Sequence, residues 1–214
     1  MIKIIALYLQ VFLLSINVTY SQNILSDSEP FKAGENLEYI VHYGIFNASY
    51  ASLKLTNENL DGKDLLLASG YGKTIGLARL FFKVEDFYSS YFDDTDVTPY
   101  FFKRNIYEGG YTKNLEVKFN SEYQNATVNN LKNQTIETIN TEKNVQDLIS
   151  SLYYLRKNFS EEKVSIGEQF IINMFYDSKN RELPLIYLGK DIINTKFGKI
   201  ECLKFMPTTS KSRI

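Results

Sequence analysis

The residue types that most often carry catalysis are scarce in this sequence. It contains one histidine, His42, and one cysteine, Cys202, so multi-histidine metal sites, thiolate clusters and internal disulfides are excluded. A Ser-His-Asp triad or a zinc site would have to use His42, but strand alternation places it opposite an apolar face, where we expect a surface histidine. Cys202 lies among Ile200, Leu203 and Phe205, where a lone cysteine is typically a small core residue.

Acidic residues form two short groups, Glu85-Asp86 and Asp93-Asp94-Thr95-Asp96. Paired carboxylates are the chemistry of glycoside hydrolysis, and the three aspartates of the second group could offer oxygen ligands to Ca²⁺. That group lacks the twelve-residue loop with a closing Glu that would indicate a calcium site. We therefore expect a solvated turn between two strands, and no metal or cofactor.

Two arginines and two tyrosines are the candidates for contacting a ligand: Arg104, Arg156, Tyr88 and Tyr111. Arginine is rare here, with 5 residues against 19 lysines. Each of the two arginines could form an internal ion pair, with Asp86 or Asp93 as partner, or could anchor an acidic head group. The chain has 16 Tyr and 15 Phe, which could stack sugars or line an apolar pocket, or could simply reflect a β-rich core.

Composition and motifs exclude several function classes. The formal net charge is -1 with lysines interspersed among acids, so we expect no nucleic-acid binding. Phosphate-binding P-loops, dinucleotide-binding glycine fingerprints and the nucleophile elbow of α/β-hydrolases are all missing from the sequence. A non-catalytic protein is therefore expected.

The elements that must position these residues read as antiparallel strands. In residues 37–45 the odd positions are apolar, and residues 115–119 alternate in the same way. Asp61-Gly62 and Gly109-Gly110 predict hairpin turns. Further strands are predicted over 50–57, 65–71, 100–107, 111–119, 122–128, 134–139, 168–176, 182–188, 191–196 and 199–206. So many short strands predict a mainly β fold, an antiparallel barrel or half-barrel.

One segment has helical instead of strand periodicity. Apolar residues recur at helical spacing over 145–157. Asn144 is the expected N-cap and Asp147 is expected in the first turn. This amphipathic helix should pack on a sheet face or plug a barrel mouth. A weaker helical piece is predicted over 75–82.

The first 21 residues have the pattern of a secretory signal peptide. Lys3 precedes an apolar run over 4–14, and Thr19 and Ser21 stand at the -3 and -1 positions of a cleavage site. The run is too short to span a bilayer, which takes about 20 residues. We expect export to the periplasm or cell envelope after cleavage near Ser21, and no transmembrane segment in the mature chain. A flexible lead-in should follow over 22–33, and then a single β-rich domain over 34–214.

Several phrases in fixed order carry a family resemblance. They are Phe31-Lys-Ala-Gly-Glu35, Phe82 to Asp93, Pro99 to Arg104 with Glu108-Gly-Gly-Tyr111, Asp147 to Arg156, and Gly198 to Pro207. Together they resemble the domain-of-unknown-function family 3108, exported bacterial proteins common in Bacteroidetes. The resemblance implies an all-β, barrel-like fold and export to the cell envelope, and it carries over no enzyme activity, because none is established for the family. Family members usually continue past this proline into a Trp-containing strand and an Asp-Asp turn. The resemblance therefore implies that the chain either is truncated and lacks a last hairpin, or closes its sheet differently.

Three functions remain as hypotheses, and each makes a structural prediction. A carrier of an apolar or amphipathic ligand, such as a lipid or glycan, needs space enclosed by the sheet. An assembly partner in an envelope complex needs a solid core with an exposed apolar patch or an open sheet edge. A surface-polymer hydrolase using Glu85, Asp86 or Asp93 needs two carboxylates facing each other across a cleft, about 5–9 Å apart.

Overall fold

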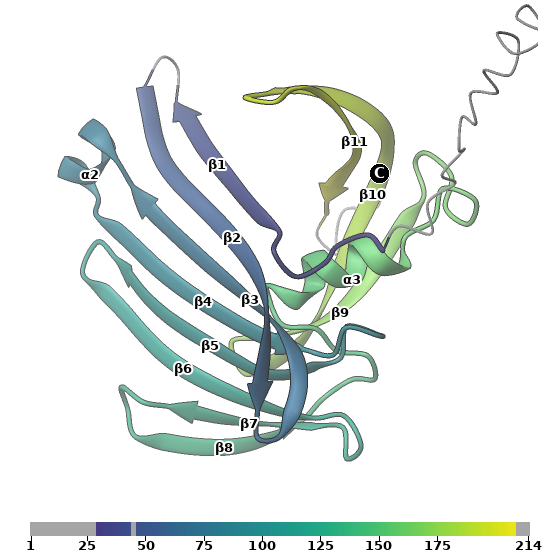
Figure 1. Ribbon diagram of the computed structural model, residues 1–214. Helices are drawn as coiled ribbons and strands as arrows, with labels where there is room; N and C mark the ends of the chain where they lie inside the picture. Colours follow the sequence, from purple (N-terminus) through teal and green to yellow (C-terminus); the bar gives the residue numbers. More distant parts are fainter. Residues whose placement is uncertain (1–28, 44–45, 209–214) are drawn as a thin grey trace, which may run out of the picture.

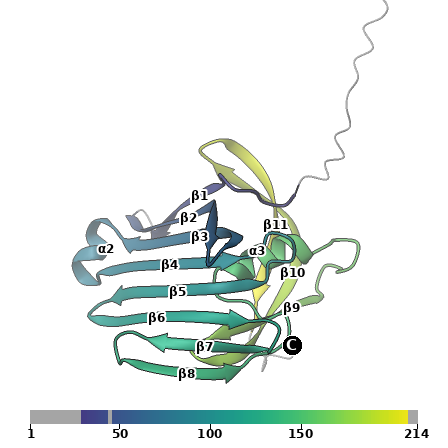
Figure 2. The same ribbon diagram turned by 60° about the horizontal axis from the view of Figure 1, so that its bottom comes forward.

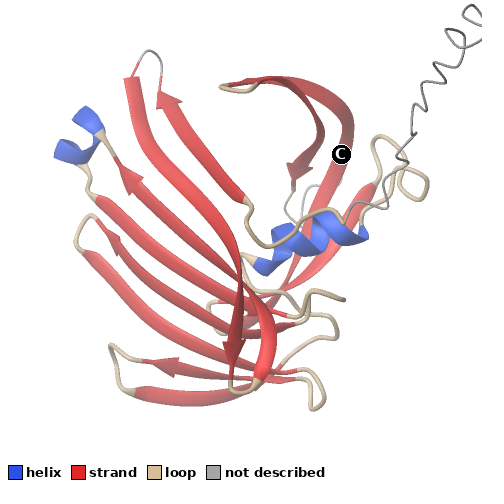
Figure 3. Cartoon of the chain, viewed as in Figure 1, coloured by secondary structure: helices blue, strands red, loops and turns tan. Residues whose placement is uncertain are grey.

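The computed structural model describes residues 29–43 and 46–208, and it is mainly β. An eight-stranded antiparallel sheet runs in chain order from β1 to β8, and a second sheet has the order β11-β10-β9. The large sheet curves around helix α3 (Ser150–Asn158), with the small sheet on the same side (Figure 1). Strands dominate the chain, as Figure 3 shows by colour. The predicted antiparallel half-barrel is confirmed, and the sheet does not close into a barrel.

Eight strands build the large sheet and three build the small one. The strands of the large sheet are β1 (Asn36–Tyr43), β2 (Phe46–Leu60), β3 (Lys63–Thr74), β4 (Val84–Phe92), β5 (Pro99–Glu108), β6 (Tyr111–Asn120), β7 (Asn125–Asn130) and β8 (Thr135–Asn140). The small sheet contains β9 (Gln169–Tyr176), β10 (Lys179–Thr195) and β11 (Gly198–Pro207), and a short helix, α2 (Gly76–Phe81), follows β3. Figure 2 shows the eight strands side by side, with β9 to β11 lying across one end of them. The predicted signal peptide, 1–21, lies outside the described residues.

Two predicted hairpin turns lie where the sequence places them. Asp61 and Gly62 have φ of 54° and 79° and join β2 to β3. Gly109 and Gly110, with φ of 57° and 98°, join β5 to β6. Left-handed conformations are cheapest for Gly, Asn and Asp, which explains why these dipeptides form the turns.

Strand β4 is an element that the periodicity did not predict. Its concave-side residues are Asp86, Tyr88, Ser90 and Phe92, which pair across the sheet with residues of β5. Three of these four carry polar groups although the face is largely covered, so the strand does not show alternation of apolar and polar residues. The carboxylate of Asp86 accepts a hydrogen bond from the backbone of β5. The hydroxyl of Ser90 donates one to the segment before α3.

Helix α3 begins at Ser150, later than the predicted start at 145. Gln146 instead makes a parallel bridge to Met174 of β9, so the residues before the helix belong to the sheet layer. Asp147 is fully buried and caps the helix from this segment: its Oδ1 accepts the backbone N–H groups of Ile149 and Ser150 at 2.8 and 2.9 Å. The expected N-cap, Asn144, lies outside the helix with φ of 55°.

The same carboxylate fastens the helix to the sheet. The hydroxyl of Ser90 on β4 donates to Asp147 Oδ2 at 2.6 Å, and both residues are fully buried. Burial raises the pKa of Asp147 to about 6, although hydrogen bonds from Ser90, Ser150 and Ile149 act in the opposite direction. A buried carboxylate with several donors is therefore the polar link between α3 and the concave face.

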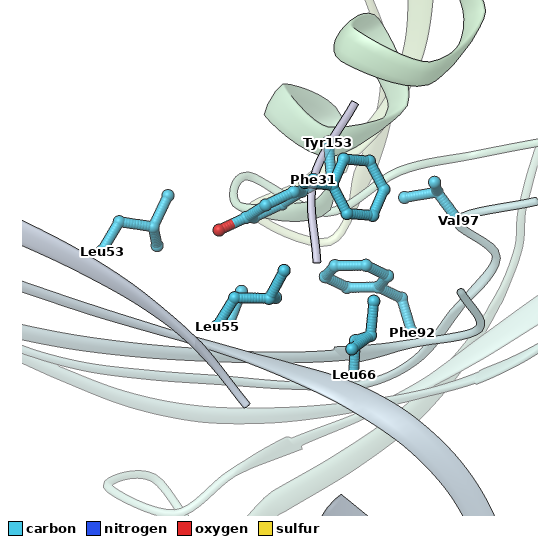
Figure 4. Packing of buried hydrophobic residues seen from close by; sticks show 8 residues of the cluster. Phe31, Leu53, Leu55, Leu66, Phe92, Val97 and Tyr153 are labelled. Atoms are coloured by element: carbon cyan, nitrogen blue, oxygen red, sulfur yellow. The ribbon is translucent and has the colours of Figure 1, made fainter. Parts of the chain in front are cut away.

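An aromatic cluster fills the space between α3 and the first strands of the sheet. Tyr153 of α3 packs against Phe31 and Phe92, with ring centroids 4.9 and 5.1 Å away (Figure 4). Leu55 and Val97 complete the same core and are fully buried. Phe31 belongs to the expected lead-in over 22–33, which is described from Glu29 onward, and its burial ties this part of the lead-in to the helix. This part of the concave side is therefore solid.

Candidate functional site

Charged and aromatic side chains meet on the concave face, beside α3. Asp86 and Tyr88 of β4, Arg104 of β5 and Lys113 of β6 occupy neighbouring positions on this face: Tyr88 lies opposite Arg104, and Ile106 lies opposite both Asp86 and Lys113. Asp177, in the turn between β9 and β10, reaches this group from the small sheet. We call Asp86, Tyr88, Arg104, Lys113 and Asp177 the concave-face cluster.

Arg104 is the most enclosed cation of this cluster, with only 7% of the residue exposed. Its Nη1 donates to Asp177 Oδ1 at 2.9 Å, and its guanidinium lies 4.9 Å from the ring centre of Tyr176. Nε of Arg104 is buried and finds no hydrogen-bond partner among the described residues. The predicted partners of this arginine were Asp86 or Asp93, and this prediction is wrong: its ion-pair partner is Asp177.

Asp177 holds a second cation with the same oxygen atom. Lys113 Nζ donates to Asp177 Oδ1 at 2.5 Å. Partial burial pushes the pKa of Asp177 upward, but the ion pairs with Lys113 and Arg104 outweigh it and leave the pKa below its ordinary value. Lys113, Tyr176 and Asp177 were missed by the sequence reasoning, because no local pattern shows that the β9–β10 turn lies over β5 and β6.

Asp86 lies on the same face, and 8% of the residue is exposed. Within the described part of the chain it has no ion-pair partner closer than 4 Å. Its Oδ1 accepts the backbone N–H of Tyr107 at 3.2 Å. Burial raises the pKa of Asp86, and the nearby carboxylate of Glu108 adds to this increase. The cluster therefore combines donors and acceptors within a partly covered surface.

The concave face next to this cluster is not filled by α3. A Cβ added to Gly72, opposite Asp86 on β3, would meet no atom within 4 Å. By contrast, a Cβ on Gly70 would touch Ile149 and Tyr88 at 3.4 Å. The helix thus covers the sheet up to Gly70, and the open part of the concave face begins at Gly72.

Apolar side chains border this open part. Tyr39 and Val41 of β1 share the concave face with Leu37, and each is 51% exposed. The outer half of the β10–β11 hairpin exposes apolar side chains on both of its faces: Ile193 and Ile200 lie opposite each other on one face, and Ile192 and Leu203 lie on the other. At its tip, Lys196 pairs with Glu38 of β1 at 3.1 Å. In Figure 1 the hairpin bends toward β1 over the concave side.

The remaining candidates lie apart from the cluster. Arg156 forms a two-pronged ion pair with Glu35, with distances of 2.7 and 2.6 Å, so the predicted pairing with Asp86 or Asp93 is wrong here too. Tyr111 is 55% exposed at the start of β6, and Lys132 Nζ lies 5.9 Å from its ring centre. Neither Arg156 nor Tyr111 reaches Arg104.

The sole histidine and cysteine lie outside the cluster as well. His42 is exposed on β1, as predicted. Cys202 is half-buried in the β10–β11 hairpin and is not part of the buried core that the sequence predicted for it. The hairpin packs too little against the rest of the protein to bury it.

The acidic residues do not form the arrangement that a hydrolase needs. Glu85 points to the convex side, where it pairs with Arg79 at 3.2 Å, because it neighbours Asp86 on the strand. Asp93 caps the β4–β5 turn by accepting backbone N–H groups of Thr95 and Asp96 at 2.7 and 3.4 Å. Asp94 and Asp96 are exposed in that turn, which matches the predicted solvated turn.

A separate hollow of about 350 Å³ lies at the turn end of the sheet. It is lined mainly by polar residues of the β6–β7 turn and of the segment before α3, among them Asn120, Gln124, Glu142 and Asn144. The described residues contain no group of three or more His, Cys, Asp or Glu side chains able to hold a metal ion. Among the same residues, no helix combines the length and the apolar character needed to cross a bilayer.

Comparison with known proteins gives a family. The family model of DUF3108, a protein of unknown function, matches residues 38–214. A search of the curated proteins finds no match. Among solved structures, the chain is similar to the crystal structure of a DUF1089 family protein from Pseudomonas aeruginosa, with 10% identity and a TM-score of 0.41, covering 78% of this chain and 90% of that chain. This similarity is too weak to carry a site or a function across.

Proposed function

The chain belongs to the DUF3108 family of proteins of unknown function, and we propose that it is an exported, non-catalytic binding protein for an apolar or amphipathic ligand, a lipid or a glycan. The observation that carries the proposal is the open part of the concave face, where space above Gly72 adjoins both the charged cluster and apolar side chains of β1. Export rests on the signal-peptide pattern of residues 1–21.

The two kinds of surface suit the two ends of an amphipathic molecule. Tyr39 and Val41 offer exposed apolar area, whose removal from water favours binding by roughly 25 cal/mol per Å². Arg104, Lys113 and Asp86 offer donors and acceptors that would fix the polar end. The same geometry gives no support to hydrolysis, because Glu85, Asp86 and Asp93 point to different parts of the molecule.

A blocking substitution tests the proposal. Gly72→Leu would place a side chain in the open space without a clash at Cβ. Lys73→Leu puts the same residue type at the neighbouring position on the convex face, and serves as the control. We expect saturable binding of a dansylated C11 fatty acid, followed by its fluorescence, to weaken about tenfold or more in Gly72→Leu and to persist in Lys73→Leu. Absence of saturable binding to the unmodified protein would refute a lipid as the ligand. Unchanged binding by a folded Gly72→Leu protein would refute the open part of the concave face as the binding site.

The assembly-partner hypothesis has its own supporting observation. The β10–β11 hairpin exposes apolar residues from both strands, and Phe197 at its tip is 83% exposed. Exposed apolar side chains that lie next to one another are typical of interaction sites, and Ile193 lies directly opposite Ile200 on one face of this hairpin. A photo-crosslinking residue at position 197 should then give one discrete adduct in cells, whereas the same residue at Tyr123, 68% exposed elsewhere, should not. Equal labelling at both positions would contradict this second function.

A further inference from the structure

The carboxylate of Asp177 occupies a position that would also suit the anionic group of a ligand. It lies between Arg104 and Lys113, and both cations bind a single oxygen, Oδ1. The residue comes from a two-residue turn in which both Asp177 and Ser178 have positive φ, 50° and 57°. The anion at this place is thus supplied by a turn of the small sheet and not by the floor of the concave face.

Arg104 keeps unused hydrogen-bonding capacity at this place. A guanidinium has five N–H donors and prefers two parallel bonds to a carboxylate or phosphate. Here Nη1 donates to Asp177. The residue is 93% covered, and its Nε is buried without a hydrogen-bond partner in the described part of the chain. An unpartnered donor on a buried cation is costly, so the pair with Asp177 leaves Arg104 incompletely satisfied.

The surroundings decide where a negative group could enter. Asp86 and Glu108 lie on one side of Arg104 and repel anions there. Lys113 and Asp177 are partly exposed, with 20% and 39% of their side chains accessible. The side that Asp177 now occupies is therefore one from which an incoming anion would meet both cations, away from Asp86.

We propose that Arg104 and Lys113 bind the anionic head group of the ligand, a phosphate or a carboxylate, and that Asp177 holds this place in its absence. The inference rests on the proposed function, because it names the head group of the amphipathic ligand expected at the concave face. Exchange of one anion for another leaves the two cations paired throughout, so neither is left buried without a counter-charge.

Calorimetric titration with three probes separates the parts of the proposal. Dodecyl phosphate and dodecyl maltoside, both below their micelle concentrations, share an alkyl chain and differ in head group, and inorganic phosphate has no chain. We expect dodecyl phosphate to bind about tenfold or more tightly than the maltoside, since charge-assisted bonds are about twice as strong as neutral ones. Inorganic phosphate should bind more weakly than dodecyl phosphate.

Substitutions test the named residues with the same three probes. Arg104→Gln, or the less buried Lys113→Gln, should remove the preference for dodecyl phosphate, and Lys103→Gln on the opposite face of β5 should keep it. Asp177→Asn removes the competing charge and should tighten dodecyl phosphate binding severalfold, whereas Asp61→Asn, which also loses a lysine partner, should not.

The outcomes separate the anionic head-group site from the proposed binding of an amphipathic ligand. Equal binding of both amphiphiles that is blocked by Gly72→Leu would overturn the anionic head group while keeping an amphipathic ligand. Binding of neither would overturn both. A third outcome is that inorganic phosphate binds as tightly as dodecyl phosphate and loses this binding in Arg104→Gln. That result would confirm the anion site and overturn the amphipathic ligand.

Discussion

Replacing Asp147 by asparagine should stabilise this protein at neutral pH. The carboxylate is fully buried, and its pKa of about 6 lies above the ordinary value of 3.8. The ionised form is therefore less favourable in the fold than in water, even with donors from Ser90, Ile149 and Ser150 in place. Asparagine keeps an acceptor for the two backbone N–H groups and an amide that can donate to Ser90, but it carries no charge.

The size and pH dependence of the effect come from linkage between protonation and folding. Between pH 4 and 6 the native protein holds a proton on Asp147 more firmly than the unfolded chain does, so this residue costs stability as the pH rises. The cost is about 3 kcal/mol at pH 7 and about half of that at pH 5. Asp147→Asn should thus exceed the unmodified protein in unfolding free energy by up to about 3 kcal/mol at pH 7, with a smaller advantage at pH 5.

Urea unfolding at the two pH values measures this difference. Other carboxylates also titrate in this range, so the informative quantity is the difference between variant and unmodified protein at each pH. Asp93→Asn is a matched control, because Asp93 also caps a turn with its carboxylate but is not fully buried. An Asp147→Asn protein that is less stable than the unmodified protein at pH 7, or a difference that is the same at both pH values, would refute the reasoning.

Three further substitutions probe the packing around α3. Tyr153→Phe removes a buried hydroxyl that has no hydrogen-bond partner among the described residues. Thermal unfolding should therefore show unchanged stability or an increase of up to about 1 kcal/mol. A clear loss of stability would show that the hydroxyl has a partner. Leu55→Ala at a fully buried position should cost about 3 kcal/mol in urea unfolding, whereas Leu80→Ala, at a residue 79% exposed, should change little. Glu35→Gln leaves the half-buried Arg156 without its counter-charge and should cost about 2 kcal/mol; no change in the urea midpoint would show that this pair is not structural.

Local patterns gave a good account of the strands and turns. Asp61-Gly62 and Gly109-Gly110 form the hairpins that these dipeptides predict, since few other residues adopt positive φ at low cost. Most of the predicted strands lie in the structure, with shifts of a few residues such as β7 at Asn125–Asn130 instead of 122–128. Period-2 patterning works for these strands because one face is covered and the other meets water.

The predictions were wrong where polar side chains are buried. Strand β4 carries Asp86 and Ser90 on a covered face, so it lacks the expected alternation. The helix was extended over 145–149 because apolar residues recur there, but Gln146 pairs with β9 and Asp147 turns inward to Ser90. These polar groups are stable in the interior only through partners distant in sequence, and a local pattern does not show such partners.

Residue types and their alternation were enough to predict the class of the fold and its turns, and residues 1–21 predict export of the chain. The sequence also singled out Arg104, Tyr88 and Asp86, because scarce charges and aromatics on alternating strands are informative. The pairing of distant residues emerged from the folded chain: Asp177 meets Arg104 and Lys113, and Arg156 meets Glu35. The physical reason is that strand alternation sets the face on which a side chain lies, whereas the packing of the small sheet over the large one sets its partner.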